Sequence, residues 1–168
     1  VCDIAVRDGV FAEKVSPKAE VVDAKGLVLT PGFVDMHVHL REPGQTSKES
    51  VATGTAAAAA GGFTSIVAMP NTVPAADNAS TIRLINDIVA ETAKVRVYQS
   101  ACLTEGRKGE TLAPFGTLKN LGVIALTDDG SCVQSAELMR NAMQYAGMFG
   151  MLVMDHCQEN TLTRTGQM

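Results

Sequence analysis

The stretch that decides the fold is Pro31-Gly32-Phe33-Val34-Asp35-Met36-His37-Val38-His39-Leu40-Arg41-Glu42-Pro43-Gly44. It predicts a turn, then an apolar strand, then a loop. Because side chains alternate between the two faces of a strand, His37 and His39 should lie on the same face. Two imidazoles on one face can chelate one metal ion, and the alternative is a strand with two polar residues facing solvent.

Composition restricts the class of protein. The chain has 168 residues, of which 46% are hydrophobic, so it is long enough for one domain with a substantial core. A net charge of −4 and the lack of any Lys/Arg run argue against nucleic acid or an anionic membrane as the main partner. A small-molecule or protein partner is expected instead. The sequence contains no apolar run of about 18 residues and no signal-type N-terminus, which predicts a cytoplasmic protein.

The four cysteines are predicted to be reduced and buried. Cys2, Cys102, Cys132 and Cys157 are widely spaced and form no CxxC motif, in a chain without export features. Cys157 follows His156 directly, which raises the alternative of a metal ligand or nucleophile. Adjacent residues of a strand point to opposite faces, however, so burial is the favoured interpretation.

Two patterns divide the chain near residue 30. Before that point, short apolar runs at 2–6, 10–11, 21–22 and 27–29 are separated by turn signals such as Asp8-Gly9, which predicts small antiparallel strands. After Pro31-Gly32, apolar runs alternate with helical patterns. The predicted domains are therefore residues 1–30 and residues 31–168.

The second region is predicted to contain repeated β/α units. Further strands are expected at 63–69, 95–102, 123–127 and 151–155, and helices at 80–93, at 111–121, from a cap at Ser135, and from a cap at Thr46 or Ser47 to residue 60. The strand interval of roughly 30 residues is that of a βαβ unit, and such runs form parallel sheets. No Gly-rich phosphate loop follows the first strand, which favours part of a (β/α)8 barrel over an open nucleotide-binding sheet. The expected fold class is α/β, a partial TIM-type barrel of about five units.

Polar residues collect where the predicted strands end. They are His37, His39 and Arg41, then Asn71, then Asp128 and Asp129, and finally His156. In a barrel the carboxyl ends of the strands meet on one face, where the catalytic residues of this fold assemble. All 3 histidines of the chain are in this set, which favours a metal site over three unrelated histidines. Imidazole with carboxylate suits zinc or another borderline divalent ion.

Four motifs carry a resemblance to a known family. They are GFVDMHVHLREPG at 32–44, AMPNT at 68–72, LTDDG at 126–130 and DHCQEN at 155–160. The sequence resembles the dihydroorotases, cyclic-amide hydrolases of pyrimidine synthesis in the amidohydrolase superfamily. The combination of HLREPG and MPNT narrows this resemblance to one bacterial type of dihydroorotase. That type is itself similar to the dihydroorotase domain of multifunctional enzymes. The segment before residue 31 resembles one part of the family's small β-sandwich.

The resemblance implies a ligand set. His37 and His39 would bind one zinc ion and His156 a second. Many relatives bridge the two ions with a carboxylated lysine, but this sequence has no Lys at a strand end. In the most similar subgroup an aspartate of the DDG motif bridges them instead, which implies Asp129, with Asp128 as the alternative.

The resemblance also implies a substrate site and a reaction. Arg41 and Asn71 would hold the carboxylate of the substrate, whereas the alternatives are an Arg41 salt bridge with Glu42 and a turn role for Asn71. The implied reaction is the reversible hydrolysis of dihydroorotate to N-carbamoyl-aspartate, in which a metal ion lowers the pKa of water to near 7. Sister enzymes such as allantoinase or hydantoinase are an alternative, which Arg41 disfavours because their substrates lack that carboxylate. A catalytically silent scaffold for aspartate transcarbamoylase, and a homodimer, are further alternatives.

The sequence departs from the family pattern in two respects. The family barrel has eight strands, and its later strands supply another histidine ligand and an aspartate acid/base, so no catalytic acid/base is assigned in this chain. A fragment of a protein of about 400 residues is therefore expected, because five units cannot close a barrel. Gln158 stands where relatives more often have an acidic residue, and this change would tune metal affinity.

Overall fold

The computed structural model describes residues 3–163, so Cys2 lies outside the described residues. The chain divides into two compact units, Val1–Pro31 and Gly32–Met168. Each unit has its own internal structure, and the site residues predicted from the sequence all belong to the second.

The first unit contains one hairpin. Strands β1 (Ala5–Arg7) and β2 (Val10–Ala12) pair antiparallel, with Arg7 opposite Val10. The two-residue loop Asp8-Gly9 has φ of 53° and 78°, as a type I′ turn requires. The strands expected at 21–22 and 27–29 are absent from the described structure, and this prediction was wrong. Val21 and Val28 are 90% and 87% exposed, because this unit offers them neither a pairing strand nor an apolar surface.

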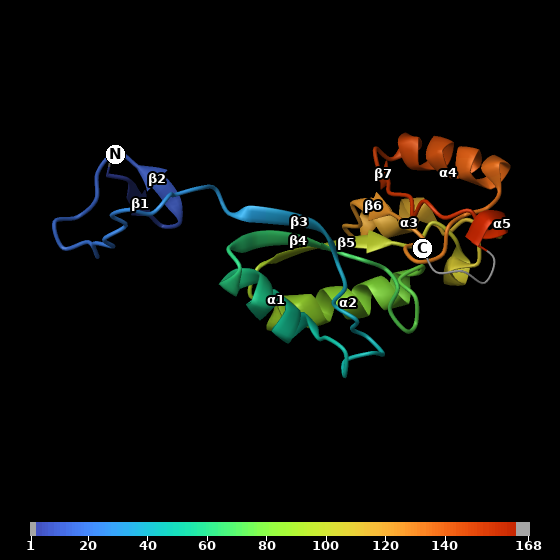
Figure 1. Cartoon of the computed structure of the whole chain (residues 1–168), viewed down its shortest axis with the longest axis horizontal. Coiled ribbons are helices and arrows are strands. Elements are labelled where there is room, and N and C mark those ends of the chain that lie inside the picture. Colours follow the sequence, from blue (N-terminus) through green and yellow to red (C-terminus); the bar gives the residue numbers. More distant parts are fainter. Residues whose placement is uncertain (1–2, 164–168) are drawn as a thin grey trace. The chain divides into compact units, whose positions relative to one another are not determined.

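The second unit is built on a parallel sheet of five strands (Figure 1). These are β3 (Phe33–Val38), β4 (Phe63–Ala68), β5 (Arg96–Ala101), β6 (Ala125–Leu126) and β7 (Leu152–Val153). Each strand pairs with the next one along the chain, in the order β3-β4-β5-β6-β7. Sequential parallel pairing with helices in the connections is the arrangement of a (β/α) barrel, so the predicted partial barrel is confirmed.

Helices and one 3-10 turn occupy the connections. They are α1 (Val51–Ala60), α2 (Ala79–Thr92), η1 (Glu105–Arg107), α3 (Phe115–Asn120), α4 (Ala136–Met148) and α5 (Asn160–Thr163). The Ser135 cap of α4 is confirmed, since its side chain accepts from the Leu138 N–H. The cap predicted for α1 was wrong, because Ser50 occupies that position and forms a capping box with Thr53.

The last two strands are shorter than the five residues expected of each. Main-chain pairing nevertheless continues one residue past each of them. The Thr127 N–H donates to the Ala101 carbonyl and the Met154 N–H to the Leu126 carbonyl, both at 2.9 Å. The expected strands therefore overestimate regular pairing, although their carboxyl ends lie where the sequence predicts them.

Two apolar clusters form the core of the second unit. One joins α1 to β3 and β4 through Leu40, Val51 and Ile66, and the larger one packs α2, α3 and α4 against the sheet around Phe115 and Leu118. The two outermost strands are less covered than the central ones, and the exposed side chains include Phe33, Val34 and Met36 on β3 and Leu152 on β7. The interior strands therefore contribute most of the buried surface of the sheet.

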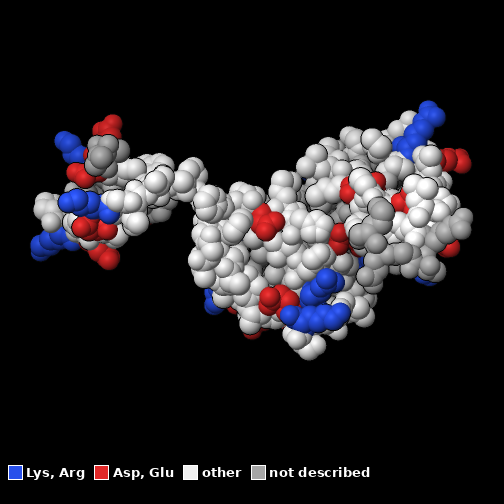
Figure 2. Space-filling model, viewed as in Figure 1, with Lys and Arg blue, Asp and Glu red and all other residues white. Residues whose placement is uncertain are grey.

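The surface shows no single dominant charge. Figure 2 shows Lys/Arg and Asp/Glu side chains in small groups of both signs over the visible face. Within residues 3–163, no helix is both long enough and apolar enough to cross a bilayer.

Candidate metal centre

The two histidines of the opening motif lie together at the carboxyl end of β3. Their ring centroids are 5.1 Å apart, with an interplanar angle of 70°. The Asp35 carboxylate accepts from the His37 N–H at 3.0 Å and thereby steadies the strand end. The two imidazoles are thus neighbours, as alternation along the strand predicts.

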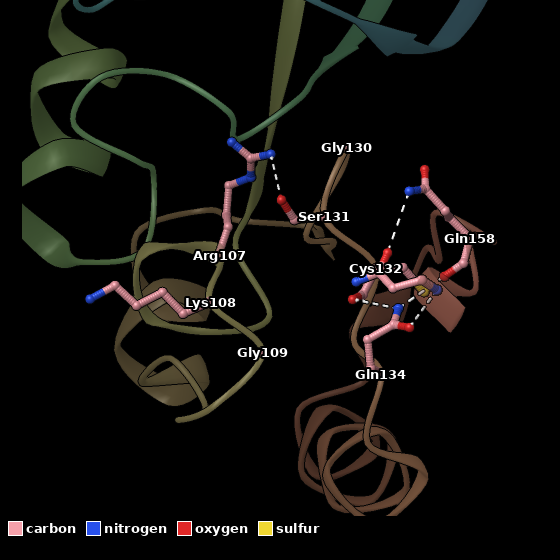
Figure 3. A pocket seen from close by; sticks show the side chains of 9 residues that line it. Arg107, Lys108, Gly109, Gly130, Ser131, Cys132, Gln134 and Gln158 are labelled. Atoms are coloured by element: carbon pink, nitrogen blue, oxygen red, sulfur yellow. Dashed lines mark hydrogen bonds between the residues drawn. The ribbon is translucent and has the colours of Figure 1, made fainter. Parts of the chain in front are cut away.

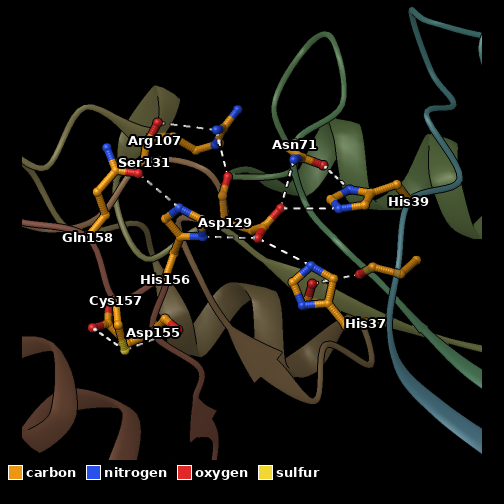
Figure 4. A network of polar contacts seen from close by, with 12 residues as sticks. His37, His39, Asn71, Arg107, Asp129, Ser131, Asp155, His156, Cys157 and Gln158 are labelled. Atoms are coloured by element: carbon orange, nitrogen blue, oxygen red, sulfur yellow. Dashed lines mark hydrogen bonds and ion pairs between the residues drawn. The ribbon is translucent and has the colours of Figure 1, made fainter. Parts of the chain in front are cut away.

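Asp129 brings three strand ends together. Its Oδ1 lies 3.3 Å from His37 Nε2 and 3.8 Å from His156 Nδ1, while its Oδ2 lies 3.5 Å from His39 Nε2 (Figure 4). The Asp129 side chain is only 9% exposed, whereas the histidines are 30–55% exposed. The structure therefore gathers one shielded carboxylate and three more accessible imidazoles in one place.

Asn71 connects this carboxylate to His39. Its Nδ2 donates to Asp129 Oδ2 at 2.9 Å, and its Oδ1 lies 3.0 Å from His39 Nδ1. Because a carboxylate only accepts and the amide oxygen only accepts, Nδ1 of His39 must carry the proton. In the neutral imidazole with its proton on Nδ1, Nε2 of His39 has the lone pair that a metal ligand requires.

The loop after β3 is fastened to the loop after β4, which carries Asn71. The Val73 N–H donates to the Pro43 carbonyl at 3.1 Å. Gly44, at φ of +91°, lies so close that a Cβ there would be 1.9 Å from the Val73 oxygen. Only glycine fits at this contact, and the contact keeps Asn71 beside His39.

The two adjacent aspartates after β6 face different surroundings. Asp128 is 3% exposed and accepts hydrogen bonds from the N–H and the Oγ1 hydroxyl of Thr104, which follows β5. Burial raises the pKa of the Asp128 carboxyl, and the two Thr104 hydrogen bonds oppose that rise. The Asp128 carboxylate therefore joins the loop after β6 to the loop after β5, whereas the Asp129 carboxylate faces the histidines.

Arg107 reaches the same loop from η1. Its Nη2 donates to the Asp129 carbonyl at 2.6 Å and to Ser131 Oγ at 3.2 Å. Arg107 also lines a pocket of about 290 Å³ beside the centre, shown in Figure 3. The other lining residues are Lys108, Gly109, Gly130, Ser131, Cys132, Gln134, Gln158 and Asn160.

Gln158 contacts His156. Its Oε1 lies 3.3 Å from His156 Nε2, which donates the proton of that hydrogen bond, while Nδ1 lies on the side of Asp129. The Gln158 carbonyl accepts from Gln134 Nε2 at 2.9 Å, which attaches the loop after β7 to the segment before α4.

Arg41 follows His39 by two residues, and within the described part of the chain its side chain makes no hydrogen bond to the residues of the centre. It has a left-handed backbone, with φ of 56°, and is half-buried. The neighbouring Glu42 carboxylate accepts from the Val51 N–H at 2.8 Å, at the start of α1. Among residues 3–163, all ion pairs within 4 Å involve Asp129 and a histidine, so the alternative of an Arg41–Glu42 salt bridge is not observed.

The cysteines differ from one another in burial. Cys102 is fully buried, and burial first, then the charge of Asp128, raises the pKa of its thiol. Cys132 is partly buried and Cys157 is exposed, and both thiols lie within 3.8 Å of the Asp155 carboxylate. Burial was therefore wrongly predicted for Cys157, because the chain after β7 runs along the surface. All three described cysteines are unbridged, as the sequence predicts.

The donor set fits a divalent metal ion. One ligand atom each of His37, His39 and Asp129 lies within 4.8 Å of the others. Two imidazoles and a carboxylate are ligands that zinc and similar ions accept. His156 approaches Asp129 Oδ1 from the end of β7, which provides a further imidazole next to this group.

Two contributors to the centre were missed by the sequence interpretation. Thr104 lies two residues after the strand predicted at 95–102, at the carboxyl edge of the sheet, so its position in the sequence could have indicated a contribution to the site. Arg107 lies in a loop between Gly106 and Gly109, and no spacing rule connects it with Asp129. Only the folded arrangement reveals its role.

The fold and the site together define a class. Parallel β/α units of the barrel type, with histidines and a carboxylate at the strand carboxyl ends, are the architecture of metal-dependent barrel hydrolases. An L-hydantoinase (dihydropyrimidinase) from Arthrobacter aurescens has the same fold, with a TM-score of 0.78 and 20% identity over 96% of this chain and 38% of its own.

The family follows from the sequence comparisons. A family model described as Dihydro-orotase-like matches residues 26–168, and the chain belongs to this family. It is 51% identical over 150 residues to a dihydroorotase of Pelotomaculum thermopropionicum and 52% identical over 156 residues to one of Geotalea daltonii. A dihydroorotase of Desulforapulum autotrophicum is 45% identical over 99% of this chain. The chain spans only 35%, 36% and 41% of the lengths of these three relatives.

Proposed function

We propose that this chain carries the first part of a binuclear zinc centre. In this proposal His37 and His39 would hold one ion, His156 would hold the second, and Asp129 would contribute its carboxylate to both. The observation that carries the proposal is the shielded Asp129 carboxylate, whose two oxygens face imidazoles from the ends of β3 and β7. Residues 31–168 would then be the first half of a metal-dependent hydrolase barrel, and residues 1–30 the opening strands of a composite β-sandwich.

The reaction we propose is the reversible hydrolysis of (S)-dihydroorotate to N-carbamoyl-L-aspartate. Its support is the family match and the dihydroorotase relatives. Because the chain spans 35–41% of those three relatives, the proposal concerns a protein of their length that carries this sequence. The cytoplasmic location and the association with aspartate transcarbamoylase or a second copy stay predictions.

Each residue has a distinct task in this scheme. The ions would lower the pKa of a water molecule to near 7 and polarise the amide carbonyl. Asn71 holds His39 in the ligand tautomer, and its second amide hydrogen remains free to donate to a substrate carboxylate. Arg41 offers a planar guanidinium that fits the same carboxylate bidentately, and it has no ion-pair partner among residues 3–163. No residue of this sequence is assigned as the general acid/base.

Metal content tests the centre. We expect two zinc ions per chain by mass spectrometry of the purified whole protein. Asp129→Asn should remove at least one of them, because the bridging carboxylate loses its charge. Asp87→Asn is the matched control, since Asp87 is exposed on α2. A wild-type protein that binds no divalent ion, or an Asp129→Asn variant that keeps both, would overturn the proposal.

Steady-state kinetics test the substrate. Arg41→Ala should raise KM for dihydroorotate strongly, whereas Arg83→Ala, an exposed arginine of α2, should leave it unchanged. An unchanged KM in Arg41→Ala, with turnover of hydantoin or allantoin, would favour the sister cyclic amidases. A protein that binds metal but turns over none of these substrates would favour the silent scaffold.

A further inference from the structure

We infer that Arg107 is a positioning residue that fixes the main chain at Asp129 and thereby directs the Asp129 carboxylate toward the histidines. This inference rests on the proposed metal centre, and its first observation is a pair of hydrogen bonds. Nη2 of Arg107 donates to the Asp129 carbonyl at 2.6 Å and to Ser131 Oγ at 3.2 Å (Figure 4). One side chain from the loop after β5 thus holds two residues of the loop after β6.

The carbonyl that Arg107 holds belongs to the central peptide of a tight turn. The Ser131 N–H donates to the Asp128 carbonyl at 2.7 Å, so Asp129 and Gly130 are the two central residues. Gly130 has φ of +76°, the conformation that a type II turn requires at its third position. The peptide between the two central residues is the one whose orientation distinguishes type I from type II turns. A donor on its oxygen therefore selects one orientation.

The position of this turn matters for the Asp129 side chain. The carboxylate leaves the main chain at the Cα next to the held carbonyl, so a displacement of the turn would move both carboxylate oxygens. These oxygens now lie within 3.3–3.8 Å of imidazoles from two other strand ends. On the other side of Asp129, Asp128 is anchored to Thr104. Arg107 supplies the second anchor, on the side of Gly130.

Arg107 is poorly suited to a purely structural role. Its backbone is left-handed, with φ of 59°, a region in which glycine or asparagine is more stable than arginine. Its Nε is buried and has no acceptor among the described residues. The left-handed backbone costs free energy of folding, and such costs concentrate at functional sites. The gain that offsets them is the placement of Asp129.

The main test is metal affinity, measured in the whole protein by competition with a chromophoric chelator. We expect Arg107→Gln to weaken zinc binding by about 10–100-fold, the loss typical when a residue that orients a ligand is removed. Arg107→Lys should keep most of the affinity, because an ammonium can still donate to the Asp129 carbonyl. Lys108→Gln is the matched control in the same loop and should bind zinc as the wild type does.

A second measurement does not depend on metal. In the metal-free protein, the amide resonance of Gly130 reports a hydrogen bond to the preceding Asp129 carbonyl. It should shift in Arg107→Gln and stay in place in Lys108→Gln. The inference is overturned if the Gly130 resonance of Arg107→Gln matches the wild type, or if that variant binds zinc normally. A wild-type protein that binds no zinc would defeat the proposed function alone, since the Gly130 measurement still decides the role of Arg107.

Discussion

The two compact units of the chain form different amounts of sheet from the same kind of sequence pattern. In both, short runs of β-branched and other apolar residues are separated by turn signals. In the second unit the connections contain helices, which pack on the neighbouring strands and bury Ile66 and Phe115 completely. In the first unit one hairpin forms, and Phe11 on β2 remains 80% exposed. Apolar runs become buried strands where nearby chain supplies the covering layer.

The largest expected effect is the loss of a core aromatic from the second unit. Phe115→Ala should lower the free energy of unfolding by about 3–5 kcal/mol, because it leaves a cavity in the larger core cluster. It also removes the stacking with Tyr145, whose ring centroid is 4.7 Å away. Since the chain has no Trp, urea unfolding followed by far-UV circular dichroism is the suitable measurement.

Phe11→Ala is the matched change in the first unit. Its expected cost is within about 0.5 kcal/mol, because an exposed ring loses little on truncation. A loss of unfolding free energy as large as that of Phe115→Ala would contradict the contrast between the two units. It would show that Phe11 is covered by a surface that the first unit does not itself provide.

This contrast also explains how much of the fold was predictable. The β/α pattern after residue 31 is local, because each strand pairs with its sequence neighbour, and it was predicted correctly. Strands at 21–22 and 27–29 were predicted from the same kind of apolar run, but they lack partners in this unit. The N-terminus of α1 was misplaced because several polar residues there are plausible caps, and tertiary contact with Glu42 favours a start at Val51.

The grouping of the site residues could be predicted because the carboxyl ends of the strands could be predicted. His37 and His39 lie at the end of β3, Asp129 and His156 follow β6 and β7, and parallel strands bring their carboxyl ends to one edge. The family resemblance implied Asp129, with Asp128 as the alternative, whereas residue type and spacing alone do not separate the two, because the difference between them depends on the hydrogen bonds from Thr104 to Asp128. The hydrogen bond from Arg107 to the Asp129 carbonyl could not be predicted, because any residue has a main-chain oxygen and no spacing rule connects the two positions.

The next-largest effect concerns Thr104 of the second unit, whose hydrogen bonds to Asp128 join the loops after β5 and β6. Thr104→Val should lower the free energy of unfolding by about 1–3 kcal/mol, because the buried Asp128 carboxylate loses one of its donors. The Gly109 N–H, which donates to Thr104 Oγ1, loses its acceptor as well. Thr30→Val in the first unit is the matched control, and its exposed side chain should make the change nearly neutral. Equal costs for the two variants would contradict this role of Thr104.

The smallest effect separates two serines that make the same kind of bond in the two units. Ser50 accepts from the Thr53 N–H at 3.1 Å as the cap of α1, and Ser16 accepts from the Lys18 N–H at 3.2 Å in an exposed turn. Ser50→Ala should lower the unfolding free energy by about 1 kcal/mol, because the freed N–H belongs to a helix packed on the sheet. Ser16→Ala should change it by only a few tenths of a kcal/mol, because water replaces the lost acceptor. Urea unfolding of both variants measures the difference, and a Ser16→Ala cost that equals the Ser50→Ala cost would mean that the first unit is as cooperatively folded as the second.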